Sequence, residues 1–105
     1  MGNSDVIKIA EKFADAVRKK FDYKSIILFG SFVKRTNTSD SDIDIAVVFK
    51  DFSDTINMQL ELMRLRRKID SRIEPHPFRE KDFTLSNPLV NEIVKYGQEI
   101  KFNVK

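Results

Sequence analysis

The sequence predicts an α/β domain in which a small mixed β-sheet is flanked by helices. Helical and extended segments alternate along the chain, which is typical of this class. The extended segments are short apolar runs, and the helical ones repeat apolar residues at helical spacing. The chain has 105 residues, of which 41% are apolar and 33% charged. We therefore expect a single globular domain over residues 1–105.

The first half of the chain holds two predicted helical segments and two predicted strands. Residues 4–20 place Val6, Ala10, Phe13 and Val17 on one helical face. The run SIILF and the run DIDIAVVF are apolar without regular alternation, as expected for buried strands. The expected elements are a helix over 4–20, a strand over 25–29, a helical turn over 32–35, a loop over 36–41 and a strand over 42–49.

The second half repeats this alternation. Two prolines in the extended segment 71–78 cannot donate ladder hydrogen bonds, so this strand is expected at a sheet edge or to end near Glu74. Ser53 or Asp54 can cap the helix expected over 54–70. Asn87-Pro88 is a typical helix start and Gly97 a typical stop. The expected elements are a helix over 54–70, a strand over 71–78, a helix over 89–96 and a last strand over 98–104.

The helix expected over residues 54–70 carries two apolar stripes. Met58, Leu62, Leu65 and Ile69 form the first, and a second lies roughly half a turn away at Ile56, Leu60 and Met63. A helix that covers one sheet face needs only one stripe. The second is either covered by another part of this chain or forms an interface with a partner chain. We expect its three residues to be partly exposed in the isolated monomer.

The residues expected to bind phosphate and metal lie at the end of the first predicted strand and at the start of the second. Gly30-Ser31 follows a buried strand and opens a helical turn, where backbone N–H groups can bind a phosphate and Ser31 adds a hydroxyl. Asp42 and Asp44 lie two residues apart on a strand and therefore share a face. Two neighbouring carboxylates commonly bind a divalent cation, although exposed pairs are often only solvated.

Further charged residues extend this candidate site. Lys34 and Arg35 are either triphosphate contacts or exposed charge on a short helix. Glu74 lies on the next predicted strand after a helical crossover, which would place it beside Asp42 and Asp44. It is either an ordinary acid near a strand end or the third carboxylate of a two-metal phosphoryl-transfer site. Carboxylate ligands without cysteine favour Mg²⁺, with Mn²⁺ as the alternative, over Zn²⁺. His76, the single histidine, lies between two prolines and is interpreted as structural rather than as a ligand.

The motif Gly30-Ser31, ten residues, then Asp42-Ile43-Asp44 resembles the signature of the polymerase-beta nucleotidyltransferase superfamily. Ser41 before the first acid agrees with this signature. The short chain and the order strand, Gly-Ser, helix, strand resemble its minimal nucleotidyltransferase branch, so a polymerase-beta-like fold is expected. The family often has Arg-Gly where this chain has Lys34-Arg35, and commonly has aspartate where this chain has Glu74.

This resemblance implies a site and a reaction. Asp42 and Asp44 would bind two Mg²⁺ ions, with Glu74 completing the metal site and assisting the nucleophile. Gly30, Ser31, Lys34, Arg35 and Ser41 would bind ATP, and Ser31 would contact its β- and γ-phosphates. Minimal nucleotidyltransferases often pair with a HEPN ribonuclease toxin and act as MntA-like antitoxins, transferring AMP from ATP to a toxin tyrosine. The alternatives are nucleotidyl transfer to a small molecule or RNA, and a non-catalytic binding antitoxin.

Composition and charge also indicate where the protein is expected to work and what it is expected to bind. Cysteine is absent, which excludes a disulfide framework and thiolate metal sites. A charged N-terminal segment and the lack of a long apolar run predict neither a signal peptide nor a membrane span, so a cytoplasmic location is expected. The net charge of +3 permits a polyanionic ligand without requiring one, and direct nucleic-acid binding is not expected. Because a substrate domain does not fit in this length, we expect a partner protein to carry the acceptor.

Overall fold

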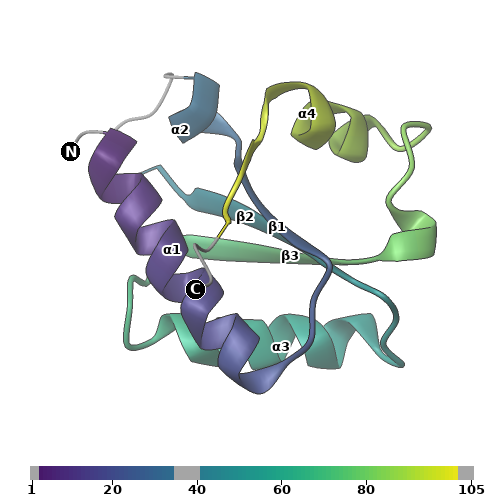
Figure 1. The fold of residues 1–105 in the computed structure, drawn as a ribbon, viewed down its shortest axis with the longest axis horizontal. Coiled ribbons are helices and arrows are strands. Elements are labelled where there is room, and N and C mark those ends of the chain that lie inside the picture. Colours follow the sequence, from purple (N-terminus) through teal and green to yellow (C-terminus); the bar gives the residue numbers. More distant parts are fainter. Residues whose placement is uncertain (1–2, 35–40, 102–105) are drawn as a thin grey trace.

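The computed structural model describes residues 3–34 and 41–101 and confirms the predicted alternation of helices and strands (Figure 1). A short 3₁₀ helix, Glu80–Asp82, lies in the connection before the last helix. The elements in chain order are α1 Asn3–Lys20, β1 Ser25–Phe29, α2 Ser31–Lys34, β2 Ile43–Phe49, α3 Thr55–Arg66, β3 Ile73–Arg79, α4 Pro88–Tyr96 and β4 Gln98–Glu99.

Within these ranges the four strands form one mixed sheet with the order β3-β2-β1-β4. β1 pairs antiparallel with both β2 and β4, whereas β2 and β3 run parallel. The parallel pair is joined by α3, which is the crossover that parallel neighbours require. This arrangement confirms the predicted fold class, a small mixed sheet flanked by helices.

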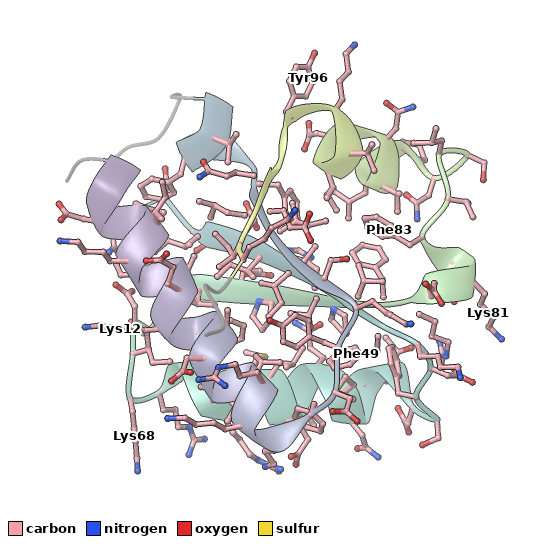
Figure 2. All side chains as sticks on the ribbon, in the orientation of Figure 1. Lys12, Phe49, Lys68, Lys81, Phe83 and Tyr96 are labelled. Atoms are coloured by element: carbon pink, nitrogen blue, oxygen red, sulfur yellow. The ribbon has the colours of Figure 1, made fainter. Side chains whose placement is uncertain are left out.

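The two faces of the sheet are covered differently. One face packs against α1 and α3 and forms the main core, which includes Phe13, Ile45 and Leu62. On the other face, α4 covers a smaller cluster built around Phe29, Ala46 and Ile93. Figure 2 labels a residue that packs in each cluster, Phe49 in the first and Phe83 beside α4 in the second. Since alternate residues of a strand face opposite sides, Asp44 of β2 and Glu74 and His76 of β3 lie on the α4 side.

β3 is the edge strand that its prolines predicted, and it continues through both of them. The carbonyl oxygens of Ile73 and Pro75 accept hydrogen bonds from Arg66 Nη1 and Gln59 Nε2 of α3, each at 2.7 Å. These carbonyls therefore point away from β2, and the nitrogens of the prolines point the same way. Proline removes no ladder hydrogen bond at such positions. The strand therefore reaches Arg79, one residue beyond the predicted end.

Other predicted boundaries also differ from the structure, most of them by one or two residues. α3 ends at Arg66 instead of residue 70, because residues 67–69 form a tighter turn in which Ile69 N donates to Arg66 O. β4 contains only Gln98–Glu99 of the predicted strand, and residues 102–104 lie outside the described ranges. Residue 42 precedes β2, whose ladder begins at Ile43. Asn87 caps α4 through its side chain, as predicted, and of the two predicted caps of α3, Ser53 and Asp54, Asp54 makes the capping hydrogen bonds.

Candidate active site

Two of the predicted carboxylates lie side by side on the α4 face of the sheet. Asp44 of β2 and Glu74 of β3 are direct register partners in the parallel pair. Their neighbours Ile43 and Ile73 are also partners and are fully buried on the opposite face. Asp44 and Glu74 are both half-buried. The predicted placement of Glu74 beside Asp44 is therefore confirmed, and it follows from the β2–α3–β3 crossover.

Asp42 differs from Asp44 in its surroundings. It lies just before β2 and is exposed, whereas Asp44 keeps 26% of its side-chain surface exposed. The prediction that both acids lie on the strand is wrong for Asp42. Pairing of β2 with β3 begins at Ile43, whose N donates a hydrogen bond to Arg72 O. Ser41 precedes Asp42 and is half-buried.

The Gly30-Ser31 turn joins β1 to α2 and touches Asp44. Gly30 has a φ of +85°, a conformation that side-chain-bearing residues rarely adopt, and Val33 N donates to Gly30 O at 3.1 Å. A β-carbon at Gly30 would also collide with Asp44 Oδ2. Glycine is thus required here both by backbone conformation and by space. The turn is brought directly against one carboxylate of the candidate site, with half-buried Ser31 next to it.

The predicted triphosphate contacts Lys34 and Arg35 follow this turn. Lys34 is the last residue of α2, and only its backbone is described. Arg35 lies outside the described residues. Their proposed contact with a nucleotide stays a prediction.

His76 joins the site, which the sequence interpretation missed. Its Nε2 lies 3.1 Å from Asp44 Oδ1, and its ring lies against Phe29 with centroids 5.1 Å apart. Since His76 follows Glu74 by two residues on one strand, it shares the face of Glu74. That spacing was the available signal, but the flanking prolines pointed instead to a structural role.

An ion pair at the entrance of β3 helps to place Glu74. The carboxylate of Asp70 accepts hydrogen bonds from Arg72 N at 2.9 Å and from Arg72 Nη2 at 2.8 Å. The side-chain hydrogen bond from Arg72 is the main reason that the pKa of Asp70 lies below its ordinary value, and burial opposes this effect. The same bond raises the pKa of Arg72. Both residues lie just before Ile73, the first residue of β3, so this bonding fixes the chain as it enters the sheet.

The donor set fits a hard divalent cation in its chemistry. Asp42, Asp44 and Glu74 offer only carboxylate oxygens, the ligands that Mg²⁺ and Mn²⁺ prefer, and two of them are adjacent on one face. Among residues 3–34 and 41–101, however, no three acidic or histidine side chains are grouped closely enough to hold a metal ion. Asp44 and Glu74 are thus neighbours, but the described side chains do not form a complete metal-binding site.

A glycine turn packed against one of two paired carboxylates, on a small mixed sheet, is the arrangement expected of a nucleotidyltransferase. The chain belongs to the polymerase beta nucleotidyltransferase family, which matches it over residues 11–102. It is therefore a nucleotidyltransferase.

Two named relatives come from Methanocaldococcus jannaschii. The chain is 36% identical over 67 residues to "Putative protein adenylyltransferase MJ1379", a match that covers 63% of this chain and 67% of the relative. It is 29% identical over 96 residues to "Putative protein adenylyltransferase MJ0126", with 91% and 90% of the two chains covered.

Solved structures with the same fold include toxin–antitoxin assemblies. A toxin–antitoxin crystal structure with AMP-PNP matches with a TM-score of 0.70 and 28% identity, covering 90% of this chain and 73% of the other. A complex of a tri-AMPylated Shewanella oneidensis HEPN toxin with an MNT antitoxin matches with a TM-score of 0.64 and 26% identity, covering 92% and 73%. The fold is thus that of minimal nucleotidyltransferases.

None of the helices in the described ranges combines the length and the apolar character needed to span a bilayer.

Proposed function

We propose that this chain transfers AMP from ATP to a hydroxyl of a partner protein, a tyrosine of a HEPN ribonuclease toxin, and so acts as an antitoxin in the cytoplasm. The observation that carries the proposal is the register pairing of Asp44 with Glu74 on one sheet face, with the Gly30-Ser31 turn packed against Asp44. Both named relatives are described as protein adenylyltransferases, and one structural neighbour contains an AMPylated toxin, which supports a protein acceptor.

The residues of the site divide the work of the reaction. The Gly30-Ser31 turn would bind the triphosphate through backbone N–H groups and the Ser31 hydroxyl, with Lys34 and Arg35 adding positive charge and Ser41 a further hydroxyl. Glu74 would accept the proton of the attacking hydroxyl. The acceptor oxygen forms a bond to the α-phosphorus, the bond from that phosphorus to the β-phosphate oxygen breaks, and pyrophosphate leaves with the bonding electrons.

Asp42, Asp44 and Glu74 would hold divalent cations, two Mg²⁺ ions or alternatively Mn²⁺. Bound cations supply charge neutralisation for the triphosphate and for the developing charge on the leaving group. Asp42 is exposed and Asp44 half-buried, so in this proposal Asp44 would be the more constrained of the two ligands.

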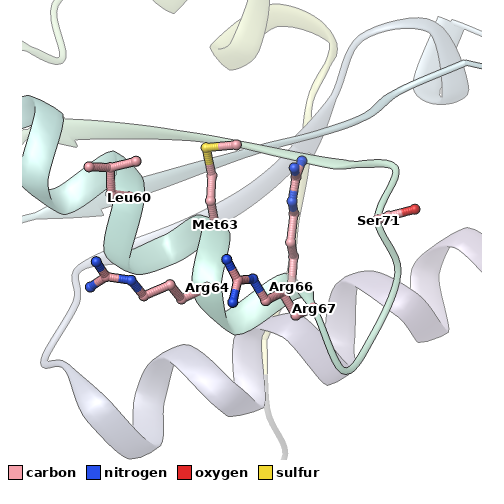
Figure 3. A pocket seen from close by; sticks show the side chains of 6 residues that line it. All are labelled: Leu60, Met63, Arg64, Arg66, Arg67 and Ser71. Atoms are coloured by element: carbon pink, nitrogen blue, oxygen red, sulfur yellow. The ribbon is translucent and has the colours of Figure 1, made fainter.

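Exposed apolar residues on α3 support an interface with a partner protein there. The second apolar stripe is uncovered as predicted, with Ile56 72% and Leu60 46% exposed and Met63 half-buried. Figure 3 shows Leu60 and Met63 at a surface hollow of about 400 Å³, beside Arg64, Arg66, Arg67 and Ser71. α3 lies on the sheet face opposite Asp44 and Glu74, so a partner bound there would reach the carboxylates around β3, which is the sheet edge.

The test is transfer of label from ATP. The chain is incubated with Mg²⁺, a candidate HEPN protein and ATP labelled at the α-phosphate, in parallel with ATP labelled at the γ-phosphate. Label from the α-position is expected on the acceptor tyrosine, and label from the γ-position is expected in pyrophosphate. Asp42→Asn, Asp44→Asn and Glu74→Gln are expected to abolish transfer, whereas Asp51→Asn, an exposed acid after β2, should transfer normally.

The other outcomes correspond to other functions. Transfer to RNA or to a small hydroxyl compound, with none to protein, would contradict the protein acceptor but would still support nucleotidyl transfer as the reaction. Neutralisation of a toxin by Asp42→Asn and Asp44→Asn as efficient as by the wild type, without transfer to any acceptor, would identify a binding antitoxin instead.

A further inference from the structure

The ring of His76 makes two contacts that the reaction above does not use. Nε2 lies 3.1 Å from Asp44 Oδ1, and the ring packs at an angle of 59° against Phe29. The side chains of Asp44 and His76 are similarly exposed, at 26% and 27%. Asp44 is therefore contacted by groups from two neighbouring strands, the Gly30 backbone after β1 and the imidazole of β3.

The strand register explains why the ring reaches Asp44. One row across the sheet consists of Glu74, Asp44 and Phe29, and the next consists of His76, Ala46 and Ile27. All six side chains face the same side, because register partners share a face. Ala46 is small, so the imidazole beside it has room to lean diagonally toward Asp44 and Phe29. The site thus depends on a small residue in the middle of the second row.

The two oxygens of Asp44 have different surroundings. Oδ1 meets His76, and Oδ2 lies against Gly30, next to the Gly30-Ser31 turn. A carboxylate only accepts hydrogen bonds, so His76 Nε2 carries the proton and donates it to Oδ1. A protonated ring nitrogen has no lone pair for a metal ion, so in this arrangement Nε2 is a donor to the ligand and not itself a ligand.

We propose that His76 is a positioning residue that holds the Asp44 carboxylate with Oδ2 toward the Gly30-Ser31 turn, ready to bind a divalent cation together with a nucleotide. This inference rests on the proposed function, in which Asp44 is a metal ligand. Groups that orient a metal ligand commonly change metal affinity by about 10-fold to 100-fold when they are removed.

The test measures metal binding without turnover. Binding of Mn²⁺ is followed by electron paramagnetic resonance and calorimetry in the presence of saturating AMP-PNP. His76→Phe keeps a ring against Phe29 and removes the donor, so Mn²⁺ affinity is expected to fall by about 10-fold or more. His76→Gln restores an N–H donor and is expected to recover most of this loss. Nitrogen NMR of the wild type should show the proton of the imidazole on Nε2.

A matched control separates positioning from general loosening. Phe83 packs edge-on against Phe78 with ring centroids 5.4 Å apart, on the same sheet face as His76. Phe83→Leu should lower the thermal midpoint and leave Mn²⁺ affinity within a factor of two. An equal loss of affinity in Phe83→Leu would overturn the inference.

Three other results would also overturn it. These are wild-type affinity in His76→Phe, no Mn²⁺ binding by the wild-type chain with AMP-PNP, and a nitrogen coupling in the Mn²⁺ spectrum that disappears in His76→Phe, which would make His76 a ligand. Failure of the proposed function is seen separately, as absent AMP transfer by a chain that still binds Mn²⁺ and AMP-PNP.

Discussion

The carboxylate of Asp44 lies directly against the backbone of Gly30, so that a single added methyl group at Gly30 would occupy the space of Asp44 Oδ2. This contact joins the expected phosphate-binding turn to the expected metal ligand. A glycine with positive φ is usually explained by backbone freedom alone. Here its missing side chain is also what allows the two parts of the site to touch.

Gly30→Ala should therefore damage both the fold and the site. The positive φ alone costs at least about 1 kcal/mol of unfolding free energy, and Asp44 must also move away. We expect a lower urea midpoint together with loss of AMP-PNP binding, measured by calorimetry.

Gly97→Ala is the matched control for that change. Its φ is −71°, yet a β-carbon there would collide with Ile93 O and the side chain of Ile27, and strand β1 separates it from Asp44. It should destabilise the fold and leave nucleotide affinity of the folded protein unchanged. Equal loss of AMP-PNP binding in both variants would contradict the role given to the Gly30–Asp44 contact.

Glu74→Gln should reduce the rate of AMP transfer by about 100-fold or more, the usual effect of removing a general base. Its shape is preserved and its side chain is only half-buried, so the urea midpoint should hardly change. Single-turnover kinetics with labelled ATP provide the measurement. Glu80→Gln, an exposed acid in the 3₁₀ helix, is the control and should transfer at the wild-type rate. A rate for Glu74→Gln within threefold of the wild type would exclude Glu74 from proton transfer.

Asp70 should make the fold sensitive to acid. Its pKa is lowered in the folded chain, mainly by the hydrogen bond from Arg72, so the protonated form is disfavoured by folding. The resulting stability is fully present above the unfolded pKa of about 3.9 and is lost as the pH falls through the lower folded pKa. Asp70→Asn should lower the free energy of unfolding at pH 7 by about 1–3 kcal/mol and flatten its decline below pH 4.

Urea titrations between pH 2.5 and 7 (about the range in which carboxyl groups titrate) measure this effect. Asp15→Asn is the comparison, because the pKa of Asp15 is also lowered, first by Lys19, but in an ion pair on the surface of α1. Identical pH profiles for Asp70→Asn and the wild type would rule out the Asp70–Arg72 pair as an acid-sensitive link.

Replacing Arg79 with lysine or with alanine should destabilise the fold. Its Nε donates to Phe52 O at 2.9 Å, its Nη1 to Thr55 Oγ1 at 3.2 Å, and its guanidinium lies 4.4 Å from the Phe52 ring centroid. These contacts join the end of β3 to the start of α3. Lysine cannot make this planar, forked contact, so Arg79→Lys should cost about 1–2 kcal/mol in urea denaturation. Arg64→Lys, an exposed change on α3, should cost less than about 0.5 kcal/mol, and similar values for both would contradict this role.

Local features of this fold could be predicted from the sequence, and relations between distant segments only in part. The caps of α3 and α4 were recognisable because Asp54 and Asn87 act on residues next to them. The pairing of Asp44 with Glu74 was predicted because a short helical crossover leaves few alternatives. The contact of His76 with Asp44 was not predicted, because it depends on the exact register of β2 with β3 and on the small side chain of Ala46. Asp42 was placed on β2 because apolar pattern does not resolve the first paired residue of a strand.

Leu60→Ser tests the surface through which a partner would act. Leu60 is 46% exposed on α3, so its replacement should change the free energy of unfolding by no more than about 0.5 kcal/mol. If Leu60 lies at the centre of the proposed interface, its replacement should cost more than about 1 kcal/mol of binding free energy, so affinity for the proposed HEPN partner should fall by about 10-fold. Leu85→Ser is the control, because Leu85 is 62% exposed and lies before α4 on the other side of the sheet. Calorimetric titration of the partner into each variant gives affinity, and labelled ATP gives transfer. If Leu85→Ser weakened partner binding and Leu60→Ser did not, the partner would lie on the α4 side, directly over the carboxylates, and the α3 stripe would have no part in acceptor binding.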